Sequence, residues 1–229
     1  RDVEAKLDVF VPSGARPGAI DAIRSLGAAV HVLDTVMDAF EAAQAHVRCS
    51  EALMIDDLDD PVIAAGYGTL LSELLEQAPA TRRLIVAAGG GLLAAGLCRA
   101  MKASGTPLRL ELAEPLGAPT VHAALAHGRA VTVDVRTEIA TLGVPRIGDG
   151  VLQTLMDSQV RSTLVSDGEA AEACRAALSC AGLSIDLAAG CSLALARRLA
   201  MAGDPLVDSC VLICGGSSWT RRVPQASVS

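Results

Sequence analysis

Several groups of residues in the sequence have the types and the spacing expected of ligand-binding or catalytic sites. An apolar run at 84–88 leads into Gly89, Gly90 and Gly91 and then into a second apolar run that begins at Leu92. A strand that passes through glycines into a helix directs successive backbone N–H groups, and the positive end of the helix dipole, at one point. This junction suits a phosphate group, and it equally suits a tight turn in which glycines allow close packing. The segment does not follow the dinucleotide pattern, GxGxxG with an acidic residue about 20 positions later at the end of the next strand, unless Glu114 takes that role, which disfavours a nicotinamide dinucleotide.

A second apolar run, near the C-terminus, ends in Cys214 and is followed by Gly215 and Gly216. Ligands of open α/β sheets bind at the carboxyl ends of the strands, so the Cys214 thiol is predicted to face the same crevice as the glycines at 89–91. A cysteine in such a run is also typical of a small, buried, hydrophobic side chain. The sequence leaves both interpretations open.

Glu114 follows an apolar run at 108–113, with the Ala118 carbonyl and the Thr120 hydroxyl close behind it. One carboxylate with neighbouring oxygens suits a hard cation, whereas a single Glu after a strand is commonly a solvated carboxylate. The acidic run from Asp56 to Asp60 favours a solvated loop over a metal site. None of the four histidines is spaced for a zinc site or a catalytic triad.

Alternating strands and helices must position these residues. Hydrophobic periodicity predicts strands at 7–11, 29–33, 84–88, 108–113 and 208–214, and helices at 17–26, 35–47, 61–77, 92–103, 119–126, 150–157, 167–181 and 188–201. This βαβ alternation predicts an α/β fold with mainly parallel sheets flanked by helices. The Asp-rich segment before Pro61 interrupts the rhythm and predicts a crossover between two lobes.

Composition narrows the classes of function. The 229 residues carry 19 Lys+Arg and 26 Asp+Glu, a net charge of −7, which argues against nucleic-acid binding because that function needs a basic face. Hydrophobic residues make up 51%, enough to bury a sizeable core and too many for a disordered chain. No uncharged apolar run reaches the roughly 18 to 20 residues of a membrane span. Seven cysteines without a CxxC pair predict free thiols in a reducing, cytoplasmic compartment.

Taken together, these motifs resemble the pyridoxal-phosphate-dependent serine/threonine dehydratases of the tryptophan-synthase-β fold type, also called fold type II. The resemblance covers nearly the whole chain, in order, through IDDLDDPVIAAGYGTLLSELLEQ, AAGGGLLAAGLCRAMKASG, LELAEPLGAPTVHAALAHGRAVTV, TEIATLGVPRIG, LVSDGEAAEACRAAL, LSIDLAAGCSLALA and CVLICGGSS. Cys214, where many relatives have Ser, is most similar to the animal-type L-serine dehydratase branch. The resemblance implies a two-lobed fold, with the remainder of a small lobe at 1–48 and a large lobe at 49–229.

The resemblance also implies roles for individual residues. Backbone N–H groups of the glycine loop would bind the phosphate of pyridoxal 5'-phosphate, and Cys214 would face its pyridine nitrogen. A thiol is a weaker acid than a carboxylic acid, so this partner would leave the nitrogen largely unprotonated. A neighbouring site would take K+ or a divalent cation. The implied phosphate-binding residues are Gly89, Gly90, Gly91 and Leu92, and the implied cation-binding residues are Glu114, Ala118, Thr120, Leu142 and Val144.

The chain departs from the family pattern at several positions. Family members bind the cofactor through a lysine in an N-terminal segment, followed by a loop that binds the substrate carboxylate, and both precede the part that aligns here. The chain has two lysines, Lys6 before the first strand and Lys102, roughly 15 Å along its helix from the glycine loop. Ala88 replaces the first glycine of the phosphate loop, Asp186 replaces a glutamate, and 217–218 is Ser-Ser where Ser-Asn is common.

We therefore expect an ammonia-lyase that converts L-serine or L-threonine to a 2-oxo acid and ammonia, acting as a cytoplasmic homodimer on a small amino-acid substrate. Because the lysine is missing and Arg1 is not an initiator Met, we expect this chain to be a fragment that is inactive alone. One alternative is a catalytically dead relative that binds a ligand or a partner subunit, which Ala88 and Asp186 favour. Another is a different fold type II lyase or racemase.

Overall fold

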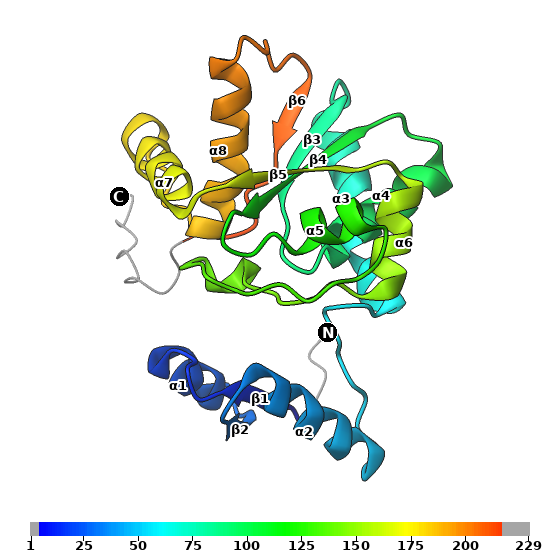
Figure 1. The fold of residues 1–229 in the computed structure, drawn as a ribbon, viewed down its shortest axis with the longest axis vertical. Coiled ribbons are helices and arrows are strands. Elements are labelled where there is room, and N and C mark those ends of the chain that lie inside the picture. Colours follow the sequence, from blue (N-terminus) through cyan, green and yellow to red (C-terminus); the bar gives the residue numbers. More distant parts are fainter. Residues whose placement is uncertain (1–4, 217–229) are drawn as a thin grey trace, which may run out of the picture. The chain divides into compact units, whose positions relative to one another are not determined.

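A computed structural model describes residues 5–216, which form two units, residues 5–55 and residues 56–216 (Figure 1). All pairings between the named strands are parallel, and helices connect them, which confirms the predicted α/β class. The sequence placed the boundary after residue 48, where helix α2 ends, and the division of the structure falls at Ile55. Residues 5–55 are unit 1 and residues 56–216 are unit 2.

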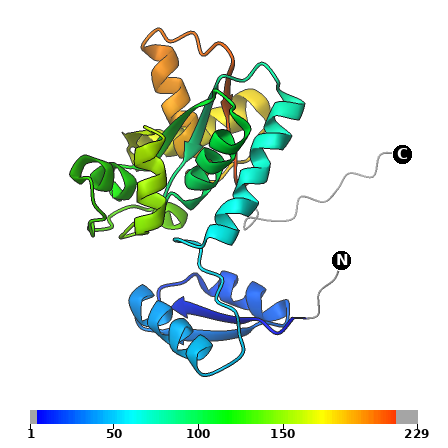
Figure 2. The same cartoon turned by 90° about the vertical axis from the view of Figure 1, so that its right-hand side faces the viewer.

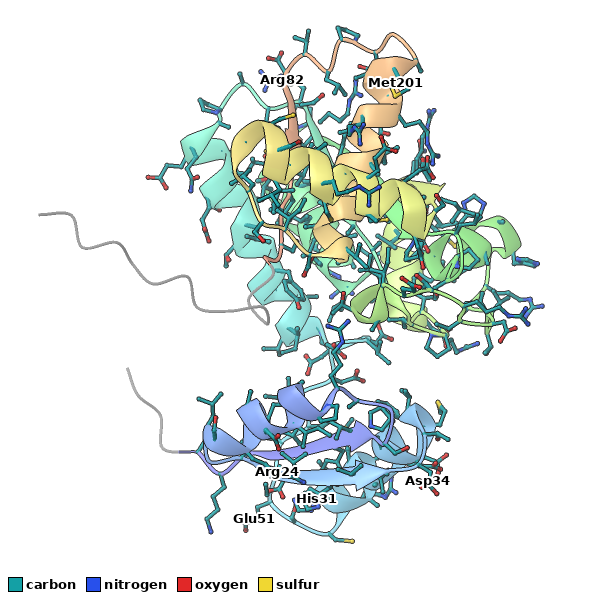
Figure 3. All side chains as sticks on the ribbon, turned by 90° about the vertical axis from the view of Figure 1, so that its left-hand side faces the viewer. Arg24, His31, Asp34, Glu51, Arg82 and Met201 are labelled. Atoms are coloured by element: carbon teal, nitrogen blue, oxygen red, sulfur yellow. The ribbon has the colours of Figure 1, made fainter. Side chains whose placement is uncertain are left out.

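Unit 1 is a βαβα arrangement with little buried surface. Its elements are β1 (Asp8–Pro12), α1 (Pro17–Ser25), β2 (Ala29–Leu33) and α2 (Val36–Arg48), and β1 pairs with β2. Thr35 and Asp38 form a capping box at the start of α2. Figure 3 labels His31 on β2, whose Nε2 lies 2.7 Å from the Asp8 carboxylate. Within residues 5–55 the one buried residue is Ala39.

Unit 2 contains a four-stranded parallel sheet in the order β5–β4–β3–β6. Its helices cover both faces of the sheet (Figures 1 and 2). The elements are α3 (Pro61–Gln77), β3 (Arg83–Ala87), α4 (Leu92–Ser104), β4 (Arg109–Pro115), α5 (Thr120–His127), the 3-10 helix η1 (Ala140–Leu142), α6 (Asp149–Asp157), β5 (Arg161–Val165), α7 (Asp167–Ala181), α8 (Leu187–Met201) and β6 (Ser209–Val211).

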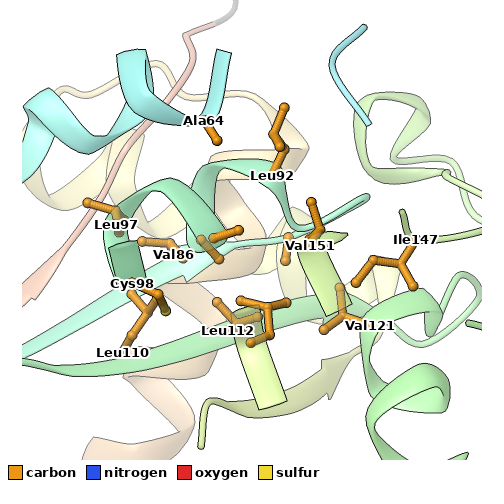
Figure 4. Close-up of a cluster of buried hydrophobic side chains, with 14 of the residues drawn as sticks. Ala64, Val86, Leu92, Leu97, Cys98, Leu110, Leu112, Val121, Ile147 and Val151 are labelled. Atoms are coloured by element: carbon orange, nitrogen blue, oxygen red, sulfur yellow. The ribbon is translucent and has the colours of Figure 1, made fainter. Parts of the chain in front are cut away.

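Alternate residues of β3 face two separate helix layers. Leu84 and Val86 pack in the core that includes α3, α4 and α6, and Figure 4 shows part of this cluster. Ile85 packs in the second core, with buried residues of α7 and α8. A parallel strand covered on both faces is continuously apolar, which explains the unbroken hydrophobic run at this point of the sequence.

Two strands differ from the sequence-based expectation. β5 was not predicted, because its sequence RSTLV has no apolar run, as suits a strand at the edge of the sheet. β6 ends at Val211, so the predicted strand at 208–214 is too long. After Leu212 donates to the Ile85 carbonyl, the chain leaves the sheet, and Cys214 lies beyond the end of the strand. None of the helices within residues 5–216 is long and apolar enough to span a bilayer.

Candidate functional site

The loop between β3 and α4 places three backbone N–H groups at a helix N-terminus. The Ala88 N–H donates to the Ala113 carbonyl at 2.9 Å, and α4 begins at Leu92 with Gly91 as its N-cap residue. Within the described part of the chain, the N–H groups of Gly89, Gly90 and Gly91 donate to no protein acceptor. Because the positive end of the α4 dipole lies at the same place, this loop fits an anion.

Neighbouring atoms exclude side chains from parts of this loop. The φ of Gly91 is +82°, a conformation that favours glycine. A Cβ on Gly91 would lie within 3.3 Å of three apolar side chains, and a Cβ on Gly89 would lie 3.0 Å from the Leu142 Cα. Ala88 has a negative φ and is 3% exposed, so alanine fits the first position of the loop without backbone strain.

Glu114 is buried at the end of β4 and is not the solvated carboxylate of the alternative interpretation. Its two carboxylate oxygens accept from the N–H groups of Val121 at 2.7 Å and His122 at 2.8 Å, in the first turn of α5. The Ser162 hydroxyl of β5 donates to the same carboxylate. Burial raises the pKa of Glu114 to about 7, against the opposing effect of these hydrogen bonds. Glu114 therefore anchors α5 to the sheet.

The other predicted cation-binding residues lie together. The buried Thr120 hydroxyl donates to the Val144 carbonyl and lies 3.5 Å from the Ala118 carbonyl oxygen. The Val144 N–H donates to the Leu142 carbonyl at 2.9 Å, and Leu142 contacts the glycine loop as described above. In residues 5–216 no group of three or more His, Cys, Asp or Glu side chains could hold a metal ion. A cation at this place would therefore be bound mainly by carbonyl and hydroxyl oxygens.

Cys214 lies beside a surface depression of about 410 Å³ that Ile185, Ile213 and Gly215 also line. The residue as a whole is exposed. Partial burial of the sulfur, together with the negative charge of Asp186, raises the pKa of the Cys214 thiol. The thiol therefore remains protonated at neutral pH.

Asp186 keeps a structural role although its side chain is shorter than the glutamate of the family pattern. Its carboxylate accepts from the Ala189 N–H at 2.8 Å and caps α8. Its backbone N–H donates to the Gly215 carbonyl at 3.4 Å, next to Cys214. The predicted departure at 217–218 lies outside the described residues.

The acidic segment Asp56–Asp60 is partly exposed, and three of its carboxylates also accept hydrogen bonds from backbone N–H groups. Asp56 accepts from the Leu58 N–H, Asp60 caps α3, and Asp59 accepts from two N–H groups of α6. The role of Asp59 had one signal in the sequence, the pair of glycines at 148 and 150. The contact of Ser162 with Glu114 had none, because β5 itself was not predicted.

Comparisons with known proteins identify the relatives of this chain. The family model described as pyridoxal-phosphate dependent enzyme matches residues 3–215. The L-serine dehydratase/L-threonine deaminase of Rattus norvegicus is 30% identical over 231 residues, which cover 95% of this chain and 64% of the relative. The L-threonine ammonia-lyase of Geobacter sulfurreducens is 32% identical over 197 residues, which cover 83% of this chain and 48% of the relative. The chain thus spans less than two thirds of the length of these two relatives.

Solved structures share the fold. The serine racemase of Dictyostelium discoideum matches with a TM-score of 0.81 and 24% identity, over 93% of this chain and 69% of that protein. Maize serine racemase matches with a TM-score of 0.84 and 21% identity, over 92% of this chain and 65% of that protein. These likenesses confirm the predicted fold class.

Proposed function

Because the chain belongs to the pyridoxal-phosphate-dependent enzyme family, we propose that it is the cofactor-binding part of an ammonia-lyase that converts L-serine or L-threonine to a 2-oxo acid and ammonia. The observation that carries this proposal is the glycine loop at the start of α4, whose three N–H groups have no protein acceptor among residues 5–216. The names of the rat and Geobacter relatives support the choice of substrate and reaction.

The loop fits the phosphate of pyridoxal 5'-phosphate. The phosphate would be bound by the backbone N–H groups of Gly89, Gly90, Gly91 and Leu92. Atoms close to Gly89 and Gly91 leave little space for side chains at these two positions. Cys214 would contact the pyridine nitrogen. When bound, the cofactor supplies an electron sink for the carbanion that forms at the substrate α-carbon.

Two features of the chain's own residues bear on this site: the protonation state of the Cys214 thiol, and the oxygen atoms that could bind a cation beside the glycine loop. Cys214 keeps its proton on Sγ at neutral pH, so it would contact a neutral ring nitrogen without forming an ion pair. The carbonyl oxygens of Ala118, Leu142 and Val144, with the Thr120 hydroxyl, would bind K+ or a divalent cation. Such a cation would hold Leu142 against Gly89.

The covalent link to the cofactor and the binding of the substrate carboxylate need residues that we do not assign to this chain. Lys102 lies in the last turn of α4, roughly 15 Å along the helix from the glycine loop. The chain spans 64% of the rat relative, so we propose catalysis for the whole protein, as a cytoplasmic homodimer.

A catalytically dead relative that binds a ligand or partner is the second candidate. Ala88 and Asp186 favoured it in the sequence, but in the structure Ala88 has an ordinary φ and Asp186 caps α8. Neither residue disrupts the site, so we rank the ammonia-lyase first.

Calorimetric titration of the purified chain with pyridoxal 5'-phosphate, inorganic phosphate and pyridoxal tests the binding step. We expect the two phosphate compounds to bind and pyridoxal to bind much more weakly. Gly90→Asp should abolish phosphate binding by placing a negative charge in the loop. Gly66→Asp is the matched control, because Gly66 is exposed on α3 and a Cβ there meets no atom.

Two results would contradict the proposal at different levels. Equal affinity for pyridoxal and its phosphate, or unchanged binding by Gly90→Asp, would contradict the role of the loop. Failure of the whole protein to release a 2-oxo acid from serine and from threonine would contradict the reaction while leaving the cofactor site in place.

A further inference from the structure

The Asp59 side chain caps a helix to which it does not belong. Its Oδ2 accepts from the Gly150 N–H at 3.1 Å, and its Oδ1 accepts from the Val151 N–H at 2.9 Å. Both donors lie in the first turn of α6, whose own N-cap residue, Gly148, supplies no side-chain cap. The negative carboxylate also meets the positive end of the α6 dipole. Asp59 thus ties the segment before α3 to the start of α6.

Two glycines leave the space that this carboxylate occupies. A Cβ on Gly148 would lie 2.5 Å from the Asp59 Cγ, and a Cβ on Gly150 would lie 2.9 Å from the Asp59 Oδ1. Both distances are shorter than real Cβ contacts, so a side chain at either position would displace the carboxylate. The segment at 148–150 is therefore shaped to receive Asp59.

Both elements that Asp59 joins contact the glycine loop. The Leu58 Cδ2 lies 3.1 Å from the position of a Cβ on Gly90. Val151 of α6 lies 3.3 Å from the position of a Cβ on Gly91. Figure 4 shows Val151 in the buried cluster that also contains Leu92, the first residue of α4. The loop is thus bounded by Leu58 at one glycine and by α6 at the next.

We propose that Asp59 is a positioning residue for the glycine loop at 89–91. By holding the start of α6, it keeps Leu58 against Gly90 and Val151 against Gly91. The backbone N–H groups of the loop then keep one fixed orientation. The identity of the ligand rests on the proposed function. The effect of Asp59 on the conformation of the glycine loop is independent of that function.

Substitutions at 58–60 separate this role from simple helix capping. Asp59→Asn leaves one acceptor oxygen for two N–H groups and removes the charge. Leu58→Ala removes the contact at Gly90 and leaves the α6 cap intact. Asp60→Ala is the matched control, because Asp60 caps α3 through the Val62 N–H at 2.7 Å and does not cap α6.

Calorimetric titration of each full-length variant with pyridoxal 5'-phosphate, inorganic phosphate and pyridoxal is the test. We expect Asp59→Asn to weaken binding of both phosphate compounds by about tenfold or more, since residues that orient binding groups have effects of this size. Weak binding of pyridoxal should not change. Leu58→Ala should act in the same direction, and it decides the question if Asp59→Asn does not fold. Asp60→Ala should lower the melting temperature and leave phosphate affinity unchanged.

Wild-type phosphate affinity in folded Asp59→Asn, with a lower melting temperature alone, would reduce Asp59 to a helix cap and overturn the proposal. If the unsubstituted chain binds neither phosphate compound, the proposed function fails separately. The positioning role is then read from the amide chemical shifts and 15N order parameters of Gly89, Gly90 and Gly91. Asp59→Asn must change these values and Asp60→Ala must not, and unchanged values in Asp59→Asn would overturn the inference.

Discussion

The Thr120 hydroxyl donates a hydrogen bond to the Val144 carbonyl oxygen, and this bond joins the start of α5 to the loop that follows η1. Thr120 is fully buried, so no solvent replaces the donor if it is lost. The same loop contacts Gly89 through Leu142. A single hydroxyl therefore connects the predicted cation site to the predicted phosphate site.

Thr120→Val tests this connection because it keeps the shape of the side chain and removes the donor. We expect the free energy of unfolding to fall by about 1–3 kcal/mol, since a buried carbonyl loses its partner. Urea denaturation measures the change. Replacing tetramethylammonium chloride with KCl should stabilise the wild type more than the variant, and equal stabilisation of the two proteins would argue against Thr120 as a cation-site residue.

Cys214 should react slowly with iodoacetamide at mildly alkaline pH, because its raised pKa lowers the fraction of thiolate. Asp186→Asn should speed the reaction by removing the nearby negative charge, and Asn remains a good N-cap for α8. Peptide mass spectrometry measures the rates, with the exposed Cys49 as the internal reference. Pyridoxal 5'-phosphate should protect Cys214 and not Cys49. Equal protection by inorganic phosphate alone would show that the ring does not contact Cys214.

The Glu169 carboxylate should make the free energy of unfolding depend on pH in the acid range. Hydrogen bonds from Ser166 and the neighbouring Arg198 hold its pKa at about 2. This value lies below the unfolded value of about 4.3, so the ionised carboxylate stabilises the folded state above pH about 4.3 and the effect disappears as the pH falls towards 2. Because the side chain is 43% exposed, we expect Glu169→Gln to cost less than about 1 kcal/mol near neutral pH.

Urea titrations of wild type and Glu169→Gln from neutral pH downwards measure this effect. The difference in unfolding free energy should narrow between pH about 4.3 and about 2. A difference that stays constant over this range would show that the carboxylate charge is not its cause.

Asp204 stabilises the amino end of the sheet. Arg83, the first residue of β3, donates to its two carboxylate oxygens at 2.8 and 3.1 Å, and the side chains are 16% and 26% exposed. Asp204→Asn should lower the free energy of unfolding, because it removes the charge from a bidentate, charge-assisted pair. Asp134→Asn is the control, because Asp134 and Arg136 are 76% and 82% exposed and should contribute little. Similar losses in both variants, by urea denaturation, would contradict the assignment.

Local sequence signals predicted most helices accurately. The helices at Pro61–Gln77 and Asp167–Ala181 match the expected ranges, and in the structure Pro61 starts the first and a capping box at Ser166 starts the second. The buried strand β3 was also expected within one residue, since both of its faces are apolar. β5 was missed because an edge strand with sequence RSTLV becomes a strand only through its pairing with β4.

The sequence by itself determined which residues could bind phosphate, because a strand, glycines and a helix follow one another within a few positions. It also indicated the fold class through the same local alternation. Only the tertiary structure decided the partners of these residues: Ser162 donates to Glu114 across 48 positions, and Asp59 accepts from Gly150 across 91. Local hydrogen bonds leave a trace in neighbouring residue types. A contact between distant segments exists only after the sheet and its helices have packed and have set where each carboxylate lies.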